Sequence, residues 1–215
     1  PIALLVSRLI NWQPKEPLTP KQKLILLASL YILTPGIIIW KVKTEFLAFA
    51  DLGLSLTAGD LRYILLGLGA SLASLVLVFS LESQGNLITW RWQNLRQIKS
   101  LLLPILSLSL LISLVEELIF RGYIFITLLA DNSFWLAAIA SSVIFAALHL
   151  IWERKQTLPQ LPGLWLMGMV LVAARVLTND TIYLAVGLHA GWICGLTCLD
   201  SADLLTYKHQ DHWFT

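Results

Sequence analysis

Charged side chains are scarce in this sequence. Asp, Glu, Lys and Arg make up 13% of the 215 residues, whereas globular domains carry about 25%. Hydrophobic residues make up 57%, and the mean hydropathy is +0.76. This composition excludes an ordinary water-soluble domain, and the long apolar runs indicate a polytopic membrane protein. The net charge is only +2, and no basic patch is interleaved with aromatic residues, so no nucleic-acid partner is expected.

Cysteine is rare as well, because the sequence contains only Cys194 and Cys198. A spacing of four residues places both on one face of an apolar helix, which favours packing over a disulfide scaffold. The opening run 1–10 lacks the basic start and small-residue cleavage site of a signal peptide. We therefore expect an interfacial or truncated segment there.

Six apolar runs approach the length of about 20 residues that a transmembrane helix requires. The first is expected to bend or break near Pro35 and Gly36, and Gly67 and Gly69 in the second allow close helix contact. In chain order the predicted spans are residues 24–40, 61–81, 101–130, 134–152, 161–177 and 182–199. The expected fold class is an all-α bundle of about six transmembrane helices.

The polar segments around these runs suggest the organisation of the chain. Residues 1–23 are expected to form a cytoplasmic or interfacial segment, 24–199 the transmembrane bundle and 200–215 a polar tail. The stretch 90–99 mixes aromatic and basic residues, so we expect it to lie flat at the membrane interface.

The basic residues in the connections and near the ends of the spans predict the orientation. Arg121 is left out as intramembrane; of the others, ten Lys and Arg residues fall on one side. Four fall on the other side, namely Lys41, Lys43, Arg62 and Arg175. Because cytoplasmic loops carry the excess of basic residues, both termini are expected to be cytoplasmic.

Glu116, Glu117 and Arg121 interrupt the third apolar run. Ionisable residues inside a membrane are costly unless they pair or face a polar cavity, and they mark a functional site by default. Glu117 and Arg121 are four residues apart with the acid first, which favours an ion pair on one helix face. Glu116 lies about 140° round an α-helix from Arg121 and cannot share it equally. It is therefore the carboxylate suited to general acid or base catalysis.

Two histidines lie in other spans. His149 ends the fourth span, four residues after Phe145, and His189 lies in the sixth. Either histidine alone is typical of a core or interfacial residue. Because three separate helices carry these ionisable groups, we expect one buried pocket to contain them.

Together these residues form three motifs in consecutive parts of the bundle. They read Glu116-Glu117-x-x-x-Arg121, Phe145-x-x-x-His149 and His189. This set resembles the signature of the CPBP family of intramembrane proteases, which includes CAAX prenyl endopeptidases and bacterial relatives linked to bacteriocin processing or self-immunity. The resemblance covers about 104–199. It implies an intramembrane endopeptidase that acts on a membrane-associated protein or peptide.

The resemblance also implies a role for each residue. Glu116 would activate a water molecule that His149 shares, and His189 would stabilise the oxyanion. The supporting residues would be Glu117, Arg121 and Phe145. No cofactor is implied. With the termini in the cytoplasm, we expect the site to open toward the cytoplasmic side.

Ile193 departs from the family pattern. The family often has an asparagine four residues after the last histidine, and an isoleucine cannot donate a hydrogen bond to an oxyanion. Half of the expected oxyanion hole is therefore missing or supplied elsewhere, and the loss of one such donor costs about 100- to 1,000-fold in rate.

Other chemistries and functions fit parts of the pattern. A zinc site would use Glu116, His149 and His189 as ligands, although no His-Glu-x-x-His pair is present and Arg121 disfavours a dication. A serine mechanism lacks the Gly-x-Ser-x-Gly turn, so Ser113 is expected to serve packing.

Two non-proteolytic functions also stay open. A catalytically inert membrane scaffold or regulator with the family fold would explain Ile193. A proton-coupled transporter would use a Glu–His chain, although no inverted repeat of broken helices is visible.

Overall fold

The computed structural model describes residues 20–45, 47–55, 60–150 and 157–208. The chain divides into two compact units, Pro1–Ala48 and Phe49–Thr215. The boundary falls inside the polar connection expected between the first two spans. The expected interfacial run 1–10 lies outside the described residues.

The first unit contains helix α2, Pro20–Thr44. The helix runs through Pro35 and Gly36 without interruption, so of the two expected alternatives, a bend or a break, the break is wrong. A proline removes a single backbone donor and can be accommodated when the rest of the helix remains hydrogen-bonded. Lys41 and Lys43 lie in the last turn, where positive charge interacts favourably with the helix dipole.

The second unit contains the other predicted spans, and their described residues fall largely on helices; the last two residues of the span 134–152 lie outside the described residues. Its helices are α3 Asp60–Gln84, α4 Ile98–Glu117, a π-helical segment Leu118–Ile124, α5 Phe125–Asp131, α6 Phe134–His149, α8 Leu161–Leu177 and α9 Tyr183–Ser201. Within the described residues, four helical stretches are long and apolar enough to cross a membrane, and α6 is a shorter apolar helix. The expected all-α polytopic bundle is confirmed.

The long third span is continuous but not uniformly α-helical. The helical stretch Trp92–Asp131 covers 40 residues, and its π-helical segment begins directly after Glu117 and includes Arg121. In a π-helix the backbone hydrogen bond spans five residues instead of four, and such segments are frequent at functional sites. The α-helical geometry assumed for the spacing of Glu116 and Arg121 therefore does not hold through this segment.

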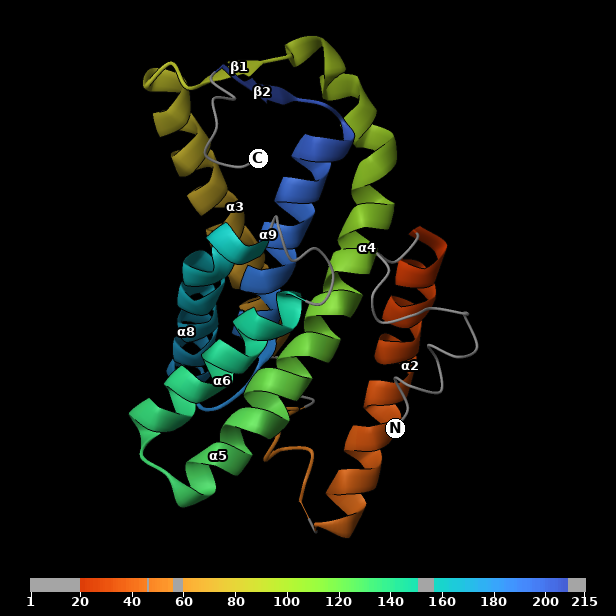
Figure 1. Cartoon of the computed structure of the whole chain (residues 1–215), viewed down its shortest axis with the longest axis vertical. Helices are drawn as coiled ribbons and strands as arrows, with labels where there is room; N and C mark the ends of the chain where they lie inside the picture. Colours follow the sequence, from red (N-terminus) through yellow and green to blue (C-terminus); the bar gives the residue numbers. More distant parts are fainter. Residues whose placement is uncertain (1–19, 46, 56–59, 151–156, 209–215) are drawn as a thin grey trace. The chain divides into compact units, whose positions relative to one another are not determined.

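Helix α9 contacts α3, α4 and α8 and lies between α3 and α4 in Figure 1. Small residues allow the close approach to α3. A Cβ atom on Gly67 would lie 2.5 Å from Leu188 N and 2.6 Å from Leu184 O. Gly187 and Gly191 of α9 would in turn clash with Ile64 and Ser71 of α3 if they carried a Cβ. Small residues at regular intervals are what membrane helices use to bring their backbones together.

Two short strands tie the ends of α3 and α9 together. Strand β1, Ile88–Trp90, pairs antiparallel with β2, Leu205–Tyr207, with Ile88 opposite Tyr207. The segment expected to lie flat at the interface thus begins with a strand and continues as a 3₁₀ helix, Trp92–Gln97. Residues 205–207 of the expected polar tail form strand β2, which pairs with β1.

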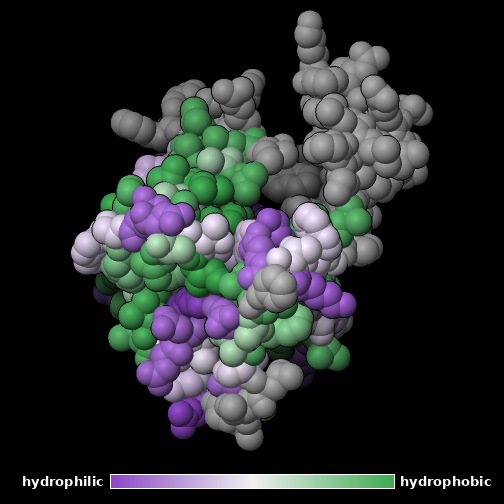
Figure 2. All heavy atoms as spheres, turned by 90° about the horizontal axis from the view of Figure 1, so that it is seen from below, coloured by the Kyte–Doolittle hydropathy of each residue, from purple (hydrophilic) through white to green (hydrophobic). Residues whose placement is uncertain are grey.

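The surface of the second unit is apolar along its helices. Side chains such as Leu65, Leu66, Val76 and Leu77 of α3 are exposed, which suits contact with lipid. Seen from below, the molecule presents patches of polar side chains among apolar ones (Figure 2). The exposure of large apolar side chains along α3 follows from the bilayer acting as the solvent of the helices.

We expect Gly67→Ala to lower the free energy of unfolding by about 1–3 kcal/mol, because a methyl group there overpacks against the backbone of α9. Gly69→Ala is the matched control, since nothing lies within 4 Å of a Cβ at Gly69 and alanine is the better helix former. Unfolding in detergent followed by circular dichroism measures both. Equal stability of the two variants would contradict the packing described for Gly67.

Candidate active site

The two glutamates are the last residues of α4, directly before the π-helical segment. Their environments differ. The side chain of Glu117 is fully buried, whereas that of Glu116 is 17% exposed. One carboxylate is thus enclosed by the bundle and the other lies at the edge of the buried region, where small molecules can approach it.

Arg121 neutralises Glu117, as the sequence predicts. Its Nη1 donates to Glu117 Oε1 over 3.0 Å, and its Nη2 donates to the backbone carbonyl of Gly168 over 3.1 Å. The guanidinium is buried, with Cζ 4.4 Å from the ring centroid of Phe145. A buried cation of this kind is tolerated because its charge is paired and its donors are hydrogen-bonded.

His189 lies between the two carboxylates. Its Nδ1 is 2.8 Å from Glu117 Oε1, and its Nε2 is 3.7 Å from Glu116 Oε2. A carboxylate oxygen accepts, so Nδ1 carries the proton in that hydrogen bond. Glu117 therefore orients the imidazole ring and directs its second nitrogen toward Glu116, in the way that carboxylates orient functional histidines elsewhere.

His149 reaches the cluster through Phe145. Its Nδ1 donates to the backbone carbonyl of Phe145 over 2.9 Å, and its ring centroid lies 4.7 Å from that of Phe145. The Phe145 ring also lies 5.7 Å from His189 and 5.1 Å from Phe120. With Nδ1 protonated, Nε2 of a neutral His149 has a lone pair available to accept a hydrogen bond.

The structure thus brings Glu116, Glu117, Arg121 and His189 into one network of short polar contacts. Phe145 packs against this network, and His149 packs against Phe145. Side chains of α4, α6 and α9 thus lie side by side here, and His149 is joined to them through Phe145. The sequence did not predict the contribution of α8, which supplies the Gly168 carbonyl to Arg121.

Ser113 also lies at this site, one turn before Glu117. Its side chain is buried, and within the described residues its Oγ and Glu117 Oε2 have no hydrogen-bond partner. The packing role expected for Ser113 fits its burial.

Arg175 is a second buried arginine, although the orientation expected from the sequence counts it with the basic residues at one membrane surface. Its side chain is only 3% exposed. It donates to the backbone carbonyls of Arg121 and Gly122, the latter at 3.4 Å, and to that of Asp51 over 2.8 Å. Without Arg175, the side of the membrane with fewer basic residues has three of them, Lys41, Lys43 and Arg62.

The contacts of Arg175 explain how the π-helical segment is stabilised. Backbone carbonyls inside a bilayer must be satisfied within the protein, and a π-helical segment disturbs the regular pattern of backbone hydrogen bonds. Arg175 supplies donors to two carbonyls of this segment and joins it to the loop that precedes α3. An arginine within an apolar helix is the sequence signal that could have identified it.

Among the residues that the structure describes, no three His, Cys, Asp or Glu side chains are grouped so that they could hold a metal ion. The set considered for zinc, Glu116, His149 and His189, is therefore not arranged as such a group. Nδ1 of His189 is hydrogen-bonded to Glu117 and Nδ1 of His149 to Phe145.

Comparison with known proteins finds one family model that is similar to part of the chain. Residues 98–194 match the family model described as Rce1-like, type II CAAX prenyl endopeptidase Rce1-like. The match runs from the first residue of α4 into α9, so it includes both glutamates, Arg121 and both histidines. Residues 98–194 are therefore similar to this family, in agreement with the CPBP resemblance. No curated protein and no solved structure gives a significant match to the chain.

The family that this segment resembles is one of CAAX-type prenyl endopeptidases. The long apolar helices and the similarity to this family both support an integral membrane protein.

We expect Arg175→Met to lower the free energy of unfolding by about 1–3 kcal/mol, because it leaves buried carbonyls without donors. Arg175→Lys should recover part of the loss, since an ammonium group still donates but lacks the geometry of the guanidinium. Denaturant unfolding in detergent measures both. Arg62→Met is the control, because Arg62 is exposed near the start of α3; an equal loss of stability there would contradict the role assigned to Arg175.

Proposed function

We propose that the chain is an intramembrane endopeptidase that cleaves a peptide bond in a membrane-associated protein or peptide, as in CAAX processing, with a water molecule activated by a glutamate. The observation that supports this most directly is the different environment of the two carboxylates. Glu117 is enclosed and engaged by Arg121 and His189, whereas Glu116 is partly exposed beside Nε2 of His189. One acid positions the site, and the other is accessible to react.

Glu116 is the proposed general base and acid. It takes a proton from the water, the resulting hydroxide attacks the carbonyl carbon of the peptide bond, and the carboxylic acid then gives its proton to the leaving nitrogen as the C–N bond breaks. Proton transfer by a positioned side chain typically contributes about 100- to 10,000-fold in rate.

His189 is the proposed group that faces the developing oxyanion. Its Nδ1–H is held by Glu117, so the ring can turn little, and Nε2 lies on the side of Glu116. When the ring is doubly protonated, Nε2 carries an N–H that donates to the oxyanion. A donor held in place before the reaction stabilises the charge without reorganisation.

His149 is the proposed partner that orients the water molecule. Its hydrogen bond to the Phe145 carbonyl fixes the tautomer in which Nε2 accepts. A water molecule that donates one hydrogen to this nitrogen can direct its other hydrogen toward a carboxylate. Phe145 holds the rings of both histidines, and Arg121 supports Glu117.

The orientation of the chain belongs to the same proposal. The excess of basic residues supports a cytoplasmic position of both termini, and in this proposal the site opens to that side. The substrate is a protein or peptide that approaches from the cytoplasmic face or within the membrane.

We expect Glu116→Gln to lower kcat/KM at least about 100-fold, because glutamine cannot take a proton from water. The assay uses the purified full chain and a peptide with a prenylated cysteine three residues before its carboxyl end, with the released tripeptide measured by mass spectrometry. Glu82→Gln is the control, since Glu82 lies near the end of α3. Undiminished cleavage by Glu116→Gln would overturn the assignment, and no cleavage by the native chain would favour the inert family member.

Ile193→Asn should raise the rate by about 100- to 1,000-fold, because it adds an oxyanion donor one helical turn after His189. Ile193 is partly buried on α9, on the same face as His189. The gain should appear in kcat, since the oxyanion exists only after attack. Ile193→Leu is the control of similar size. A rate for Ile193→Asn no higher than for Ile193→Leu would show that the missing donor is supplied elsewhere.

A further inference from the structure

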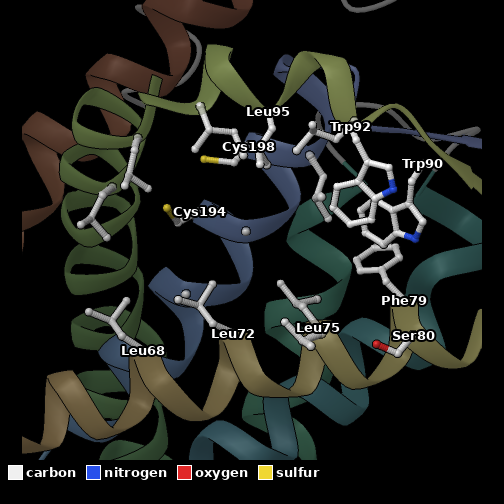
Figure 3. Close-up of a pocket in the computed structure, with 18 of the residues that line it drawn as sticks. Leu68, Leu72, Leu75, Phe79, Ser80, Trp90, Trp92, Leu95, Cys194 and Cys198 are labelled. Atoms are coloured by element: carbon white, nitrogen blue, oxygen red, sulfur yellow. The ribbon is translucent and has the colours of Figure 1, made fainter. Parts of the chain in front are cut away.

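A large apolar cavity lies in the second unit, away from the network of charges. Its volume is about 860 Å³, within the range of about 300–1,000 Å³ for ligand pockets. Figure 3 shows its walls. Leu68, Leu72 and Leu75 of α3 line one side, and the cysteines of α9 face them. Leu102 and Leu106 of α4 also line it.

The cavity and the candidate active site occupy different faces of α9. His189 faces Glu117 and Phe145, whereas Cys194 and Cys198 line the cavity. Cys198 follows His189 by nine residues, which is about half a turn away around the helix. On α4 the cavity extends to Leu106, ten residues before Glu116, or about 15 Å along the helix. The two sites therefore share α9 as a wall.

We propose that this cavity binds the acyl chains of a phospholipid taken from the bilayer. The pocket is apolar and partly open, and the molecules that surround membrane-spanning helices are lipids, so a lipid is the occupant that its surroundings supply. Its walls come from α3, α4 and α9, all within stretches suited to span a membrane. The side chains that line it offer hydrocarbon contacts, with Ser80 and Ser83 near one end. A saturated or unsaturated alkyl chain matches that chemistry.

The end of the cavity near β1 supplies the argument for a headgroup. Trp90 and Trp92 stack with ring centroids 4.9 Å apart and line this end, and tryptophan is enriched where membrane meets water. Leu95 and Ile98 line the cavity, and the residue after each of them is an exposed cation, Arg96 or Lys99.

The charges at this end favour an anionic phospholipid. Arg91 already pairs with Asp203, so Arg96 and Lys99 are the cations that we assign to the phosphate and headgroup. Basic residues beside the ends of membrane helices attract anionic lipid. In this placement the hydrocarbon chains extend from the headgroup into the part of the cavity between α3 and α9. Phosphatidylglycerol is therefore the probe expected to bind better than phosphatidylcholine.

The rate at which the two cysteines are chemically modified measures whether the cavity is occupied. Cys194 and Cys198 are its only cysteines, and both are free, buried and part of the cavity wall. The full chain is kept in digitonin, whose steroid body has no long alkyl chain. Dioleoyl phosphatidylglycerol is then titrated in while N-ethylmaleimide modification is followed by intact mass.

Phosphatidylglycerol should slow modification about tenfold at ten times its Kd, and phosphatidylcholine should require a higher concentration. Arg96→Gln with Lys99→Gln should abolish that preference, whereas Arg62→Gln, near the other end of α3, should preserve it. An unchanged modification rate would overturn the proposal. So would protection by a farnesylated cysteine methyl ester without protection by either phospholipid, because the cavity would then select an isoprenoid.

A variant that fills the cavity gives an independent test. Leu72→Trp places an indole where Leu72 lines the cavity, and Leu77→Trp is the matched control on the same helix, because Leu77 is exposed and does not line it. Phospholipid that copurifies with each protein is quantified by mass spectrometry after extensive detergent washing. The native chain and Leu77→Trp should retain about one phospholipid per chain, and Leu72→Trp should lose it. Equal retention by both variants would overturn the proposal.

Discussion

The hydrogen bonds from Arg121 and His189 to one oxygen of Glu117 are the interaction on which the site depends. Both Glu117 and Arg121 are fully enclosed, and an ion in that setting is tolerated only when it is paired and hydrogen-bonded. Pairing also has a consequence for the other acid. Since Arg121 donates to Glu117 and His189 holds the same oxygen through Nδ1, Glu116 lies at the partly exposed edge beside Nε2 of His189. Stability and the proposed chemistry thus rest on the same contacts.

Helix α9 connects this site to the other helices of the second unit. Its glycines bring it against the backbone of α3, its histidine meets the carboxylates of α4, and its cysteines border the apolar cavity. A helix with three different faces has little freedom to rotate, because any rotation moves all three sets of contacts. The close packing at Gly67 and Gly187 therefore also fixes the position of His189, although neither glycine touches it in the contacts described above.

Much of the fold follows from the sequence because a membrane imposes simple rules. Helix α8 coincides with the predicted span 161–177, and the long third span was expected because apolar length alone defines a transmembrane helix. Strand β2 could not be predicted in this way, since a strand of three residues has almost no pattern of its own and forms only by pairing with β1. Helix α2 is a case in which a local sequence signal predicts too much. Proline weakens a helix locally, but the hydrogen bonds on either side of Pro35 can maintain it.

For the site, the sequence by itself determined the pair Glu117 and Arg121, because residues four apart on a helix are neighbours whatever surrounds them. It also determined which residues carry the family motifs. Only the tertiary structure decided that His189, 72 residues from Glu117, donates to that carboxylate, and that Gly168 and Arg175 complete the surroundings of Arg121. Such contacts join different helices, and their geometry depends on the packing of the whole bundle and on the π-helical turn, which no local spacing encodes.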